Sequence, residues 1–273
     1  MVSQEQRRRQ LAREKFLRQQ QRRTSARRKS RMRNSVIASV LGVIVIGSVA
    51  LYTSGVMKND SKANASSETT PTPSATPSKA PDPCAKAASG SVKKLSWKKE
   101  PAMTIDTSAA YTMKLATTCG DIGIALKTSA APHTVNSFDF LASKGFFDHT
   151  KCHRLTTNGI YVLQCGDPTG TGSGGPGYTI PDENLKDASL KGGVYPAGTV
   201  AMANTGQKHT GGSQFFLVYQ DSQLPASYTP FGTIDAAGLK VLKKIAAAGE
   251  STGAGDGAPN ATVVIDKATV TKS

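Results

Sequence analysis

The sequence predicts a mainly β domain over residues 105–273, folded as a closed eight-stranded antiparallel barrel that is capped by two α-helices. Three observations predict this class. About eight short segments alternate apolar and polar residues, as half-buried strands do. Two further segments repeat apolar residues with the period of an amphipathic helix. All of them fit within about 170 residues, a length that suits a sheet closed on itself with a helix over each end.

The strands begin with two alternating segments, Tyr111–Thr117 and Asp121–Lys127, which flank Thr118-Cys119-Gly120 and predict a hairpin. A second hairpin is expected where Cys152–Leu155 is followed by Ile160–Cys165. Residues 168–196 are Gly-rich and predict a long irregular segment. The remaining predicted strands are Thr199–Ala203, Gln214–Tyr219, Pro230–Ile234 and Ala261–Val270.

Each predicted helix has a start signal, an apolar face and a stop signal. Pro132 opens the first helix, which ends near Gly145. Asp235 caps the second helix, which Gly249 ends. The apolar faces consist of Val135, Phe138, Leu141 and Ala142 in the first helix, and of Leu239, Leu242, Ile245 and Ala246 in the second.

Three segments are expected in front of this domain. Residues 1–34 form a basic tail, and residues 35–57 are uncharged over about the 20 residues that a membrane-spanning helix needs. The positive charge before the span predicts a single-pass plasma-membrane anchor with a cytoplasmic N-terminus and the domain outside. Residues 58–104 are a Ser/Thr/Pro-rich linker, disordered up to about residue 83, and a transition segment. A cleaved signal peptide is the alternative, although its apolar stretch would be shorter.

The net charge of +15 belongs to the N-terminal segments, because residues 105–273 carry thirteen basic and thirteen acidic side chains. The domain therefore offers no electrostatic basis for binding nucleic acid. The basic tail has two interpretations, an arm for nucleic acid or lipid surfaces and a determinant of membrane topology. The adjoining span favours the second.

The sequence lacks the structural context or the residue spacing that nucleotide-binding and metal-binding motifs require. Gly170–Gly175 matches the dinucleotide pattern G-x-G-x-x-G, but Pro176 and Gly177 follow it and no helix can begin there. None of the four histidines forms HExxH, and the cysteines lack CxxC spacing. We therefore expect no metal and no cofactor. His153 has two interpretations, a general base and a structural histidine. The absence of a nucleophile motif favours the structural histidine.

The four cysteines suggest disulfides in an exported domain. Cys152 and Cys165 lie on the two arms of the second predicted hairpin, where facing side chains are close enough to bridge. Cys84 and Cys119 would then pair by elimination. Buried thiols that pack as small apolar side chains are the alternative.

Arg154 is the strongest candidate for a functional side chain. It lies within a predicted strand next to buried positions, and a buried arginine needs partners. One interpretation is a structural salt bridge; the other is a donor that points into a groove. Three amide side chains, Gln164, Asn204 and Gln214, favour the groove, since a structural ion pair does not need them.

These residues resemble the cyclophilin family of peptidyl-prolyl cis/trans isomerases over Tyr111 to Val270. The segments that carry the resemblance are Val135–Phe138, His153-Arg154, Gln164–Asp167, Ala201–Asn204, Gly212–Phe216 and Phe231-Gly232. The family's eight-stranded barrel with two helices agrees with the pattern above. The basic tail, anchor and linker are similar to those of membrane-anchored bacterial members.

The resemblance implies a role for each matching residue. The catalytic group would be Arg154, Gln164, Phe216 and Asn204. The substrate-binding group would be Tyr161, Val162, Ala203, Gln214, Leu224 and Tyr228. Two extra residues lie between Arg154 and Gln164, within Thr156–Ile160. Gln223 replaces the tryptophan of cyclosporin-sensitive members, which implies weak cyclosporin binding.

The resemblance thus implies a peptidyl-prolyl isomerase that assists the folding of exported, proline-containing proteins at the outer face of the plasma membrane. A tethered module that binds proline-bearing segments with little turnover is the alternative. The two-residue insertion and the changes at Tyr161, Val162 and Gln223 keep this alternative open.

Overall fold

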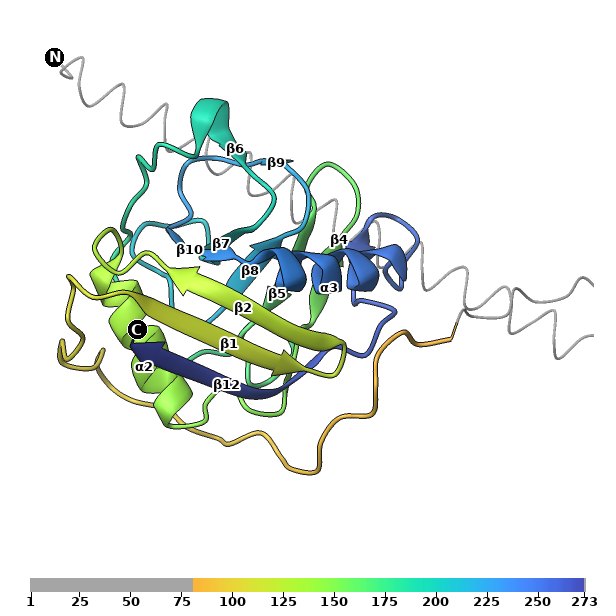
Figure 1. Cartoon of the computed structure of the whole chain (residues 1–273), viewed down its shortest axis with the longest axis horizontal. Coiled ribbons are helices and arrows are strands. Elements are labelled where there is room, and N and C mark those ends of the chain that lie inside the picture. Colours follow the sequence, from red (N-terminus) through yellow and green to blue (C-terminus); the bar gives the residue numbers. More distant parts are fainter. Residues whose placement is uncertain (1–80, 273) are drawn as a thin grey trace, which may run out of the picture. The chain divides into compact units, whose positions relative to one another are not determined.

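The computed structural model describes residues 81–272, whose main feature is one curled antiparallel sheet (Figure 1). The strands follow the order β11-β4-β5-β8-β7-β10-β2-β1-β12-β3, and a small ribbon pairs β6 with β9. The strands are β1 Tyr111–Thr117, β2 Gly120–Leu126, β3 Thr150–Lys151, β4 Arg154–Thr156, β5 Val162–Cys165, β6 Val194–Tyr195, β7 Thr199–Met202, β8 Phe215–Val218, β9 Ser222–Gln223, β10 Pro230–Ile234, β11 Asp256–Gly257 and β12 Val264–Lys272.

The β1–β2 hairpin forms as its alternating pattern predicts. Met113 and Leu115 are fully buried, whereas Thr112 and Lys114 between them are exposed. Thr117 pairs with Gly120 across a turn at Thr118 and Cys119. β12 pairs along the other side of β1, so β1 lies between β2 and β12 in the sheet.

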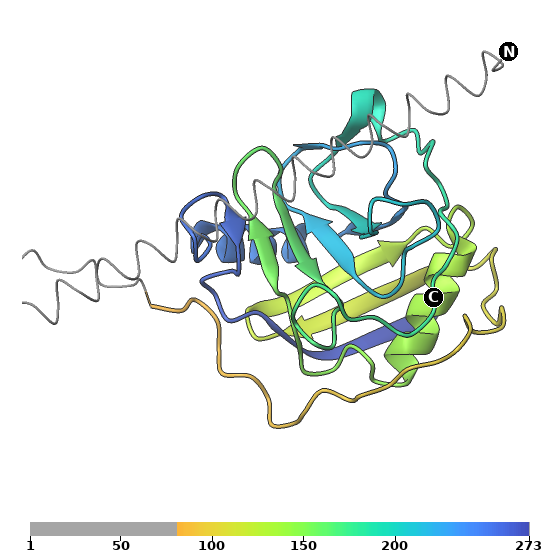
Figure 2. The same cartoon turned by 180° about the vertical axis from the view of Figure 1, so that it is seen from behind.

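Both predicted helices are confirmed, α2 at Pro132–Ser143 and α3 at Ala236–Ala247. Pro132 stands in the first turn of α2, where its missing N–H costs nothing. The Asp235 carboxylate caps α3 by accepting a hydrogen bond of 2.6 Å from the backbone N–H of Gly238. Figures 1 and 2 show the two helices toward opposite ends of the sheet.

The prediction of a closed barrel of eight strands is wrong in its details. Ten strands form the main sheet, and within residues 81–272 no ladder joins its outermost strands, β3 and β11. The predicted strand Cys152–Leu155 is divided. β3 pairs with β12, the chain passes through Cys152 and His153, and β4 then pairs with β5. This break lets the chain change partners, so the sheet curls around its core without a complete ring of hydrogen bonds.

The transition segment, whose structure the sequence pattern leaves open, packs along the domain although it contains no helix or strand. We call residues 84–104 the strap (Figures 1 and 2). A disulfide joins Cys84 to Cys119 at its beginning. The Trp97 ring packs edge-on against Phe140 of α2, with centroids 5.0 Å apart. The folded part of the chain therefore includes residues in front of position 105, where the predicted domain begins.

The predicted basic tail, the anchor over residues 35–57 and the linker up to residue 80 lie outside the described residues. Within residues 81–272, neither helix has the length and apolar content to cross a bilayer.

Candidate active site

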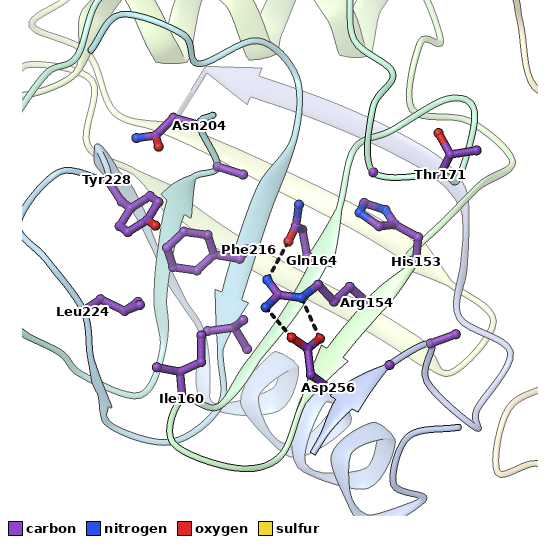
Figure 3. A pocket seen from close by; sticks show the side chains of 15 residues that line it. His153, Arg154, Ile160, Gln164, Thr171, Asn204, Phe216, Leu224, Tyr228 and Asp256 are labelled. Atoms are coloured by element: carbon purple, nitrogen blue, oxygen red, sulfur yellow. Dashed lines mark hydrogen bonds and ion pairs between the residues drawn. The ribbon is translucent and has the colours of Figure 1, made fainter. Parts of the chain in front are cut away.

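A cavity of about 540 Å³ opens where β4, β5 and β8 meet the loops after β7 and β9. Figure 3 shows that one wall is polar and the other apolar. The polar wall consists of His153, Arg154, Gln164, Thr171 and Asp256. The apolar wall consists of Ile160, Val162, Ala203, Phe216, Leu224 and Tyr228, with Asn204 at its rim.

Arg154 is held along one edge of its guanidinium group. Its Nε donates a hydrogen bond of 2.7 Å to Oδ1 of Asp256, and its Nη2 donates one of 2.8 Å to Oδ2. This bidentate pair raises the pKa of Arg154 and lowers that of Asp256. Both side chains remain partly open to solvent, with exposed fractions of 39% and 55%. The salt bridge and the cavity position, which were alternatives for Arg154, therefore occur together.

A chain of amide hydrogen bonds continues from Arg154 across the sheet. Its Nη1 donates to Oε1 of Gln164 at 3.2 Å, and Nε2 of Gln164 donates to Oε1 of Gln214 at 2.8 Å. Nε2 of Gln214 donates in turn to the carbonyl of Gly174 at 2.9 Å. The strand register explains the first bond, because Arg154 pairs with Gln164 on adjacent strands, whereas Gln214 directly precedes the first residue of β8.

These bonds leave part of the guanidinium group available. An arginine has five N–H donors, and Asp256 and Gln164 accept from three of them. Among the described residues, one N–H on Nη1 and one on Nη2 are left for another acceptor. Arg154 thus combines a fixed orientation with a donor edge at the cavity (Figure 3).

The apolar wall is fixed by aromatic packing. Phe216 is only 5% exposed, and its ring meets the ring of Tyr228 edge-on at 5.4 Å. Behind them, the fully buried Tyr195 donates a hydrogen bond of 2.8 Å from its hydroxyl to the carbonyl of Tyr228. The result is a preformed apolar surface opposite a charged donor, which suits a small ring attached to a polar backbone.

Both predicted disulfides are confirmed. Cys152 is bonded to Cys165, and Cys84 to Cys119. The first bond joins the residue two positions before Arg154 to the residue directly after Gln164. It therefore ties together the two chain segments that carry the polar wall.

His153 lines the cavity without a hydrogen-bond partner for either ring nitrogen among the described residues. Burial lowers the pKa of His153, an effect that the nearby Asp167 carboxylate opposes and the Arg154 charge reinforces. The ring is therefore neutral near pH 7. With no nucleophile beside it, this position fits a cavity wall rather than a general base.

Asp167 organises the Gly-rich segment that resembles a nucleotide motif. Its carboxylate accepts hydrogen bonds from the backbone N–H groups of Thr169, Thr171 and Gly172 and from the Thr169 hydroxyl. Burial alone would raise the pKa of Asp167, but these hydrogen bonds outweigh it and hold the pKa at about 2. The glycines thus belong to a compact loop that surrounds the Asp167 carboxylate.

The structure brings most of the predicted site residues together. Eight of the ten line this cavity, while Gln214 lines the adjoining one. Tyr161 is the exception, because its ring packs on Tyr219 at 5.9 Å. The side chains of Ile160 and Val162 face the cavity on either side of it, as alternation along an extended chain requires. The segment Thr156–Ile160, where the resemblance implies two extra residues, runs from the end of β4 into the turn before β5, and Asn158 and Ile160 form a bridge there.

Sequence reasoning missed Asp256, the main partner of Arg154. It lies 102 residues away in the sequence, on the short strand β11 within a Gly-rich segment before the last strand. In the sequence, Asp256 is a single carboxylate between two glycines, on a segment with no other charge. This pattern does not show that Asp256 is the partner of Arg154. Ile160 and Tyr195 were also missed, although alternation with Val162 could have identified Ile160.

Comparisons with known proteins agree with this geometry. The model of the family described as cyclophilin type peptidyl-prolyl cis-trans isomerase/CLD matches residues 112–270. A Mycobacterium leprae protein named probable peptidyl-prolyl cis-trans isomerase B is 52% identical over 166 residues, which cover 58% of this chain and 56% of that protein. The Mycobacterium tuberculosis H37Rv protein of the same name is 50% identical over 165 residues, which cover 58% and 53%.

The crystal structure of a Cryptosporidium parvum cyclophilin type peptidyl-prolyl cis-trans isomerase superposes with a TM-score of 0.50 at 25% identity. The superposition covers 60% of this chain and 99% of that chain. With the two mycobacterial proteins, by contrast, the alignments cover only about half of the relative's length.

Proposed function

This chain belongs to the cyclophilin type peptidyl-prolyl cis-trans isomerase family, and from that premise we propose that its cavity catalyses cis/trans isomerisation of Xaa-Pro peptide bonds. The observation that carries the proposal is the position of Arg154. Its guanidinium is fixed by Asp256 at Nε and Nη2 and by Gln164 at Nη1, and its two remaining N–H donors lie at a cavity whose apolar surface is centred on Phe216.

The chemistry follows from the resonance of the amide bond. The barrier to rotation about a peptide bond is about 18–20 kcal/mol, and it falls when the prolyl nitrogen loses conjugation with the carbonyl. A guanidinium N–H that donates to this nitrogen stabilises its pyramidal form, which exists only in the twisted state. Arg154 therefore binds the transition state more strongly than either planar isomer, which is the requirement for catalysis. A donor that is already oriented needs little reorganisation during the reaction.

The other cavity residues position the substrate. The proline ring lies on Phe216 between Leu224 and Tyr228, where it loses contact with water. The flanking peptide passes Ala203 and Asn204 at the rim. Asn204 is itself held there, because its Nδ2 donates to the carbonyl of Ser227 at 2.8 Å. A fixed ring and a fixed flanking segment leave rotation to the intervening carbonyl.

The proposal extends to location. We infer a single-pass anchor at residues 35–57 in a bacterial plasma membrane, with the N-terminus in the cytoplasm and the isomerase domain outside. Two disulfides support exposure to an oxidising compartment. The clients would then be exported proteins whose folding waits on slow prolyl bonds.

Weak cyclosporin binding is part of the same proposal. Gln223 lies on β9, where its side chain donates to the carbonyl of Gly192 at 2.8 Å. An amide held in this way offers no large aromatic face to an apolar ligand. Because Gln223 does not line the cavity around Phe216, we propose that catalysis does not depend on Gln223.

The test is the exchange rate between the cis and trans forms of an Ala-Pro peptide, measured by NMR with catalytic amounts of the 273-residue chain. Wild type should accelerate exchange, and Arg154→Ala should lose about a hundredfold or more of kcat/KM, within the range of a lost electrostatic contact in catalysis. Lys151→Ala, an exposed change three positions away, is the matched control and should match wild type. A folded wild-type chain that binds the peptide without accelerating exchange would instead identify a binding module.

A further inference from the structure

A second cavity of about 1070 Å³ adjoins the first, on the side of the Gly-rich segment. Gln164, Gly172, Ala203 and Asn204 line both cavities. A peptide whose proline lies on Phe216 can therefore continue into the second cavity, since each extended residue adds about 3.3 Å.

All charged side chains that line the second cavity come from the strap. They are Lys98, Lys99 and Glu100, and the other lining residues are uncharged. The strap precedes the residues that match the family model, which begins at position 112. Its charges are thus an addition to the family's common domain, and they set the electrostatic character of this cavity.

Glu100 forms no salt bridge with either lysine, so one negative and two positive charges line the cavity. The Glu100 carboxylate lies 2.7 Å from Nδ1 of His133, on the first turn of α2. Among residues 81–272, no carboxylate forms a salt bridge with Lys98 or Lys99, and both lysines are exposed. Two adjacent positive charges therefore stand at the rim of the second cavity without an anionic partner.

The backbone that carries these lysines is fixed at both ends. On one side, the Trp97 N–H donates to the carbonyl of Pro176 at 2.8 Å, and its ring packs on Phe140. On the other side, Asn136 of α2 accepts from the N–H of Thr104 at 2.9 Å and donates to the carbonyl of Ala102 at 3.0 Å.

Close contact between the strap and the cavity wall depends on Gly177. A Cβ at this position would lie 2.7 Å from the carbonyl oxygen of Trp97, and its φ of 88° also favours glycine. The lysine pair is thus attached to the cavity wall at a defined place rather than on a loose arm.

We propose that Lys98 and Lys99 make the second cavity selective for peptide segments that carry an acidic residue close to the isomerised proline. The proposal rests on the function proposed above for the first cavity and adds a substrate class to it. A carboxylate of the substrate would pair with the lysine charges at the rim. Since these pairs are exposed, the expected preference is modest, about threefold to tenfold, and it falls as salt rises.

The test compares short peptides that contain one Ala-Pro bond and a single Glu, or its uncharged counterpart Gln, before or after that bond. Binding to the 273-residue chain and exchange rate are both measured. Wild type should favour the Glu peptide on one side of the proline. Lys98→Glu with Lys99→Glu should abolish or reverse this preference and leave the Gln peptide unchanged. Lys86→Glu with Lys94→Glu changes the net charge equally at exposed strap positions outside the cavity, and it should keep the preference.

Two results would overturn the proposal: equal binding of Glu and Gln peptides by wild type, or equal effects of the two double variants, which would indicate a general charge effect. Binding separates this proposal from the catalytic one. A Glu preference without accelerated exchange supports the lysine pair and contradicts the isomerase; accelerated exchange without a Glu preference does the reverse. Absence of binding by either peptide contradicts both.

Discussion

The two walls of the first cavity are stabilised by different kinds of interaction. The apolar wall around Phe216, Leu224 and Tyr228 is held by ring packing and burial. The polar wall around Arg154 is held by a disulfide, a bidentate ion pair and a chain of amide hydrogen bonds. Under the proposed function, the apolar wall receives a proline ring and tolerates small displacements. The donor on the polar wall has to meet one nitrogen in one twisted state and does not tolerate them.

This difference predicts separable effects of mutation. Changes in the apolar wall should weaken substrate binding and stability together, because the same buried area serves both. Changes in the polar wall should lower turnover more than they lower stability, because its charged groups are partly exposed.

The largest expected effect on stability is from Phe216→Ala. Removing a ring that is 5% exposed should cost about 3–5 kcal/mol of unfolding free energy and weaken peptide binding. Phe147→Ala, a fully buried ring that does not line the cavity, should cost a similar amount without affecting binding in the folded chain. Urea denaturation and peptide titration measure the two quantities. Unchanged peptide affinity in Phe216→Ala would show that the apolar wall does not receive the substrate.

Removal of each disulfide in a separate variant should distinguish an effect on stability from an effect on turnover. Each double Cys→Ser variant should lose about 2–4 kcal/mol of stability, with the larger loss at Cys84 and Cys119 because their bond closes the longer loop. Turnover of the chain that remains folded should fall more for Cys152 and Cys165, which tie the segments bearing Arg154 and Gln164. Equal turnover in both variants would mean that the bond next to Arg154 does not help to position it.

Asp256→Asn should reduce kcat/KM by about threefold to tenfold, or roughly 0.7–1.4 kcal/mol, because Arg154 loses its charged partner along one edge. Stability should change by less than about 1 kcal/mol, since the pair is exposed. Asp121→Asn removes a somewhat more exposed pair, with Lys114, that does not line the cavity, and it should leave turnover unchanged. A similar turnover in both variants would contradict the positioning role of Asp256.

The same pair has a predicted pH dependence. The hydrogen bond from Arg154 lowers the pKa of Asp256, so its contribution to stability is present above the ordinary carboxyl pKa. That contribution is lost as pH falls through the lowered pKa. Turnover in wild type should therefore stay level from neutral pH down to the ordinary range of carboxyl groups, and a decline well above that range would contradict the pairing.

His153 should produce the smallest effect. Because burial lowers its pKa, the unfolded chain binds a proton below about pH 6.5 while the folded chain does not yet do so. Stability should therefore rise with pH up to about 6.5 and then level off. His153→Gln should reduce this slope. Urea midpoints across this pH range would show the difference, and an unchanged slope in His153→Gln would contradict the burial effect.

The sequence predicts those parts of the fold that repeat locally. Helix α2 begins at a proline, α3 has a capping aspartate, and each has an apolar face within a few residues. The β1–β2 hairpin has a regular alternation of buried and exposed side chains. The Cys152–Cys165 bond follows from one hairpin. The division of the predicted strand at Cys152 and His153 was not predictable, because it arises when neighbouring residues pair with different strands.

The candidate site shows the same limit. The resemblance placed Arg154, Gln164 and Phe216 because whole motifs surround them. Asp256 has no motif, and its contact with Arg154 exists only after the chain returns from 102 residues away. Apolar residues in the strap follow no helical or strand period. The strap packs through individual contacts, such as Trp97 on Phe140, rather than through a repeated face.

The most direct test of the central claim is the cis/trans exchange rate of an Ala-Pro peptide with Arg154→Lys. The variant keeps the positive charge but loses the fork that bonds Asp256 on one edge and reaches the cavity with the other. The account predicts an exchange rate close to that of Arg154→Ala, with peptide binding retained. An exchange rate equal to wild type would show that charge alone suffices, and it would contradict the role of the fixed guanidinium.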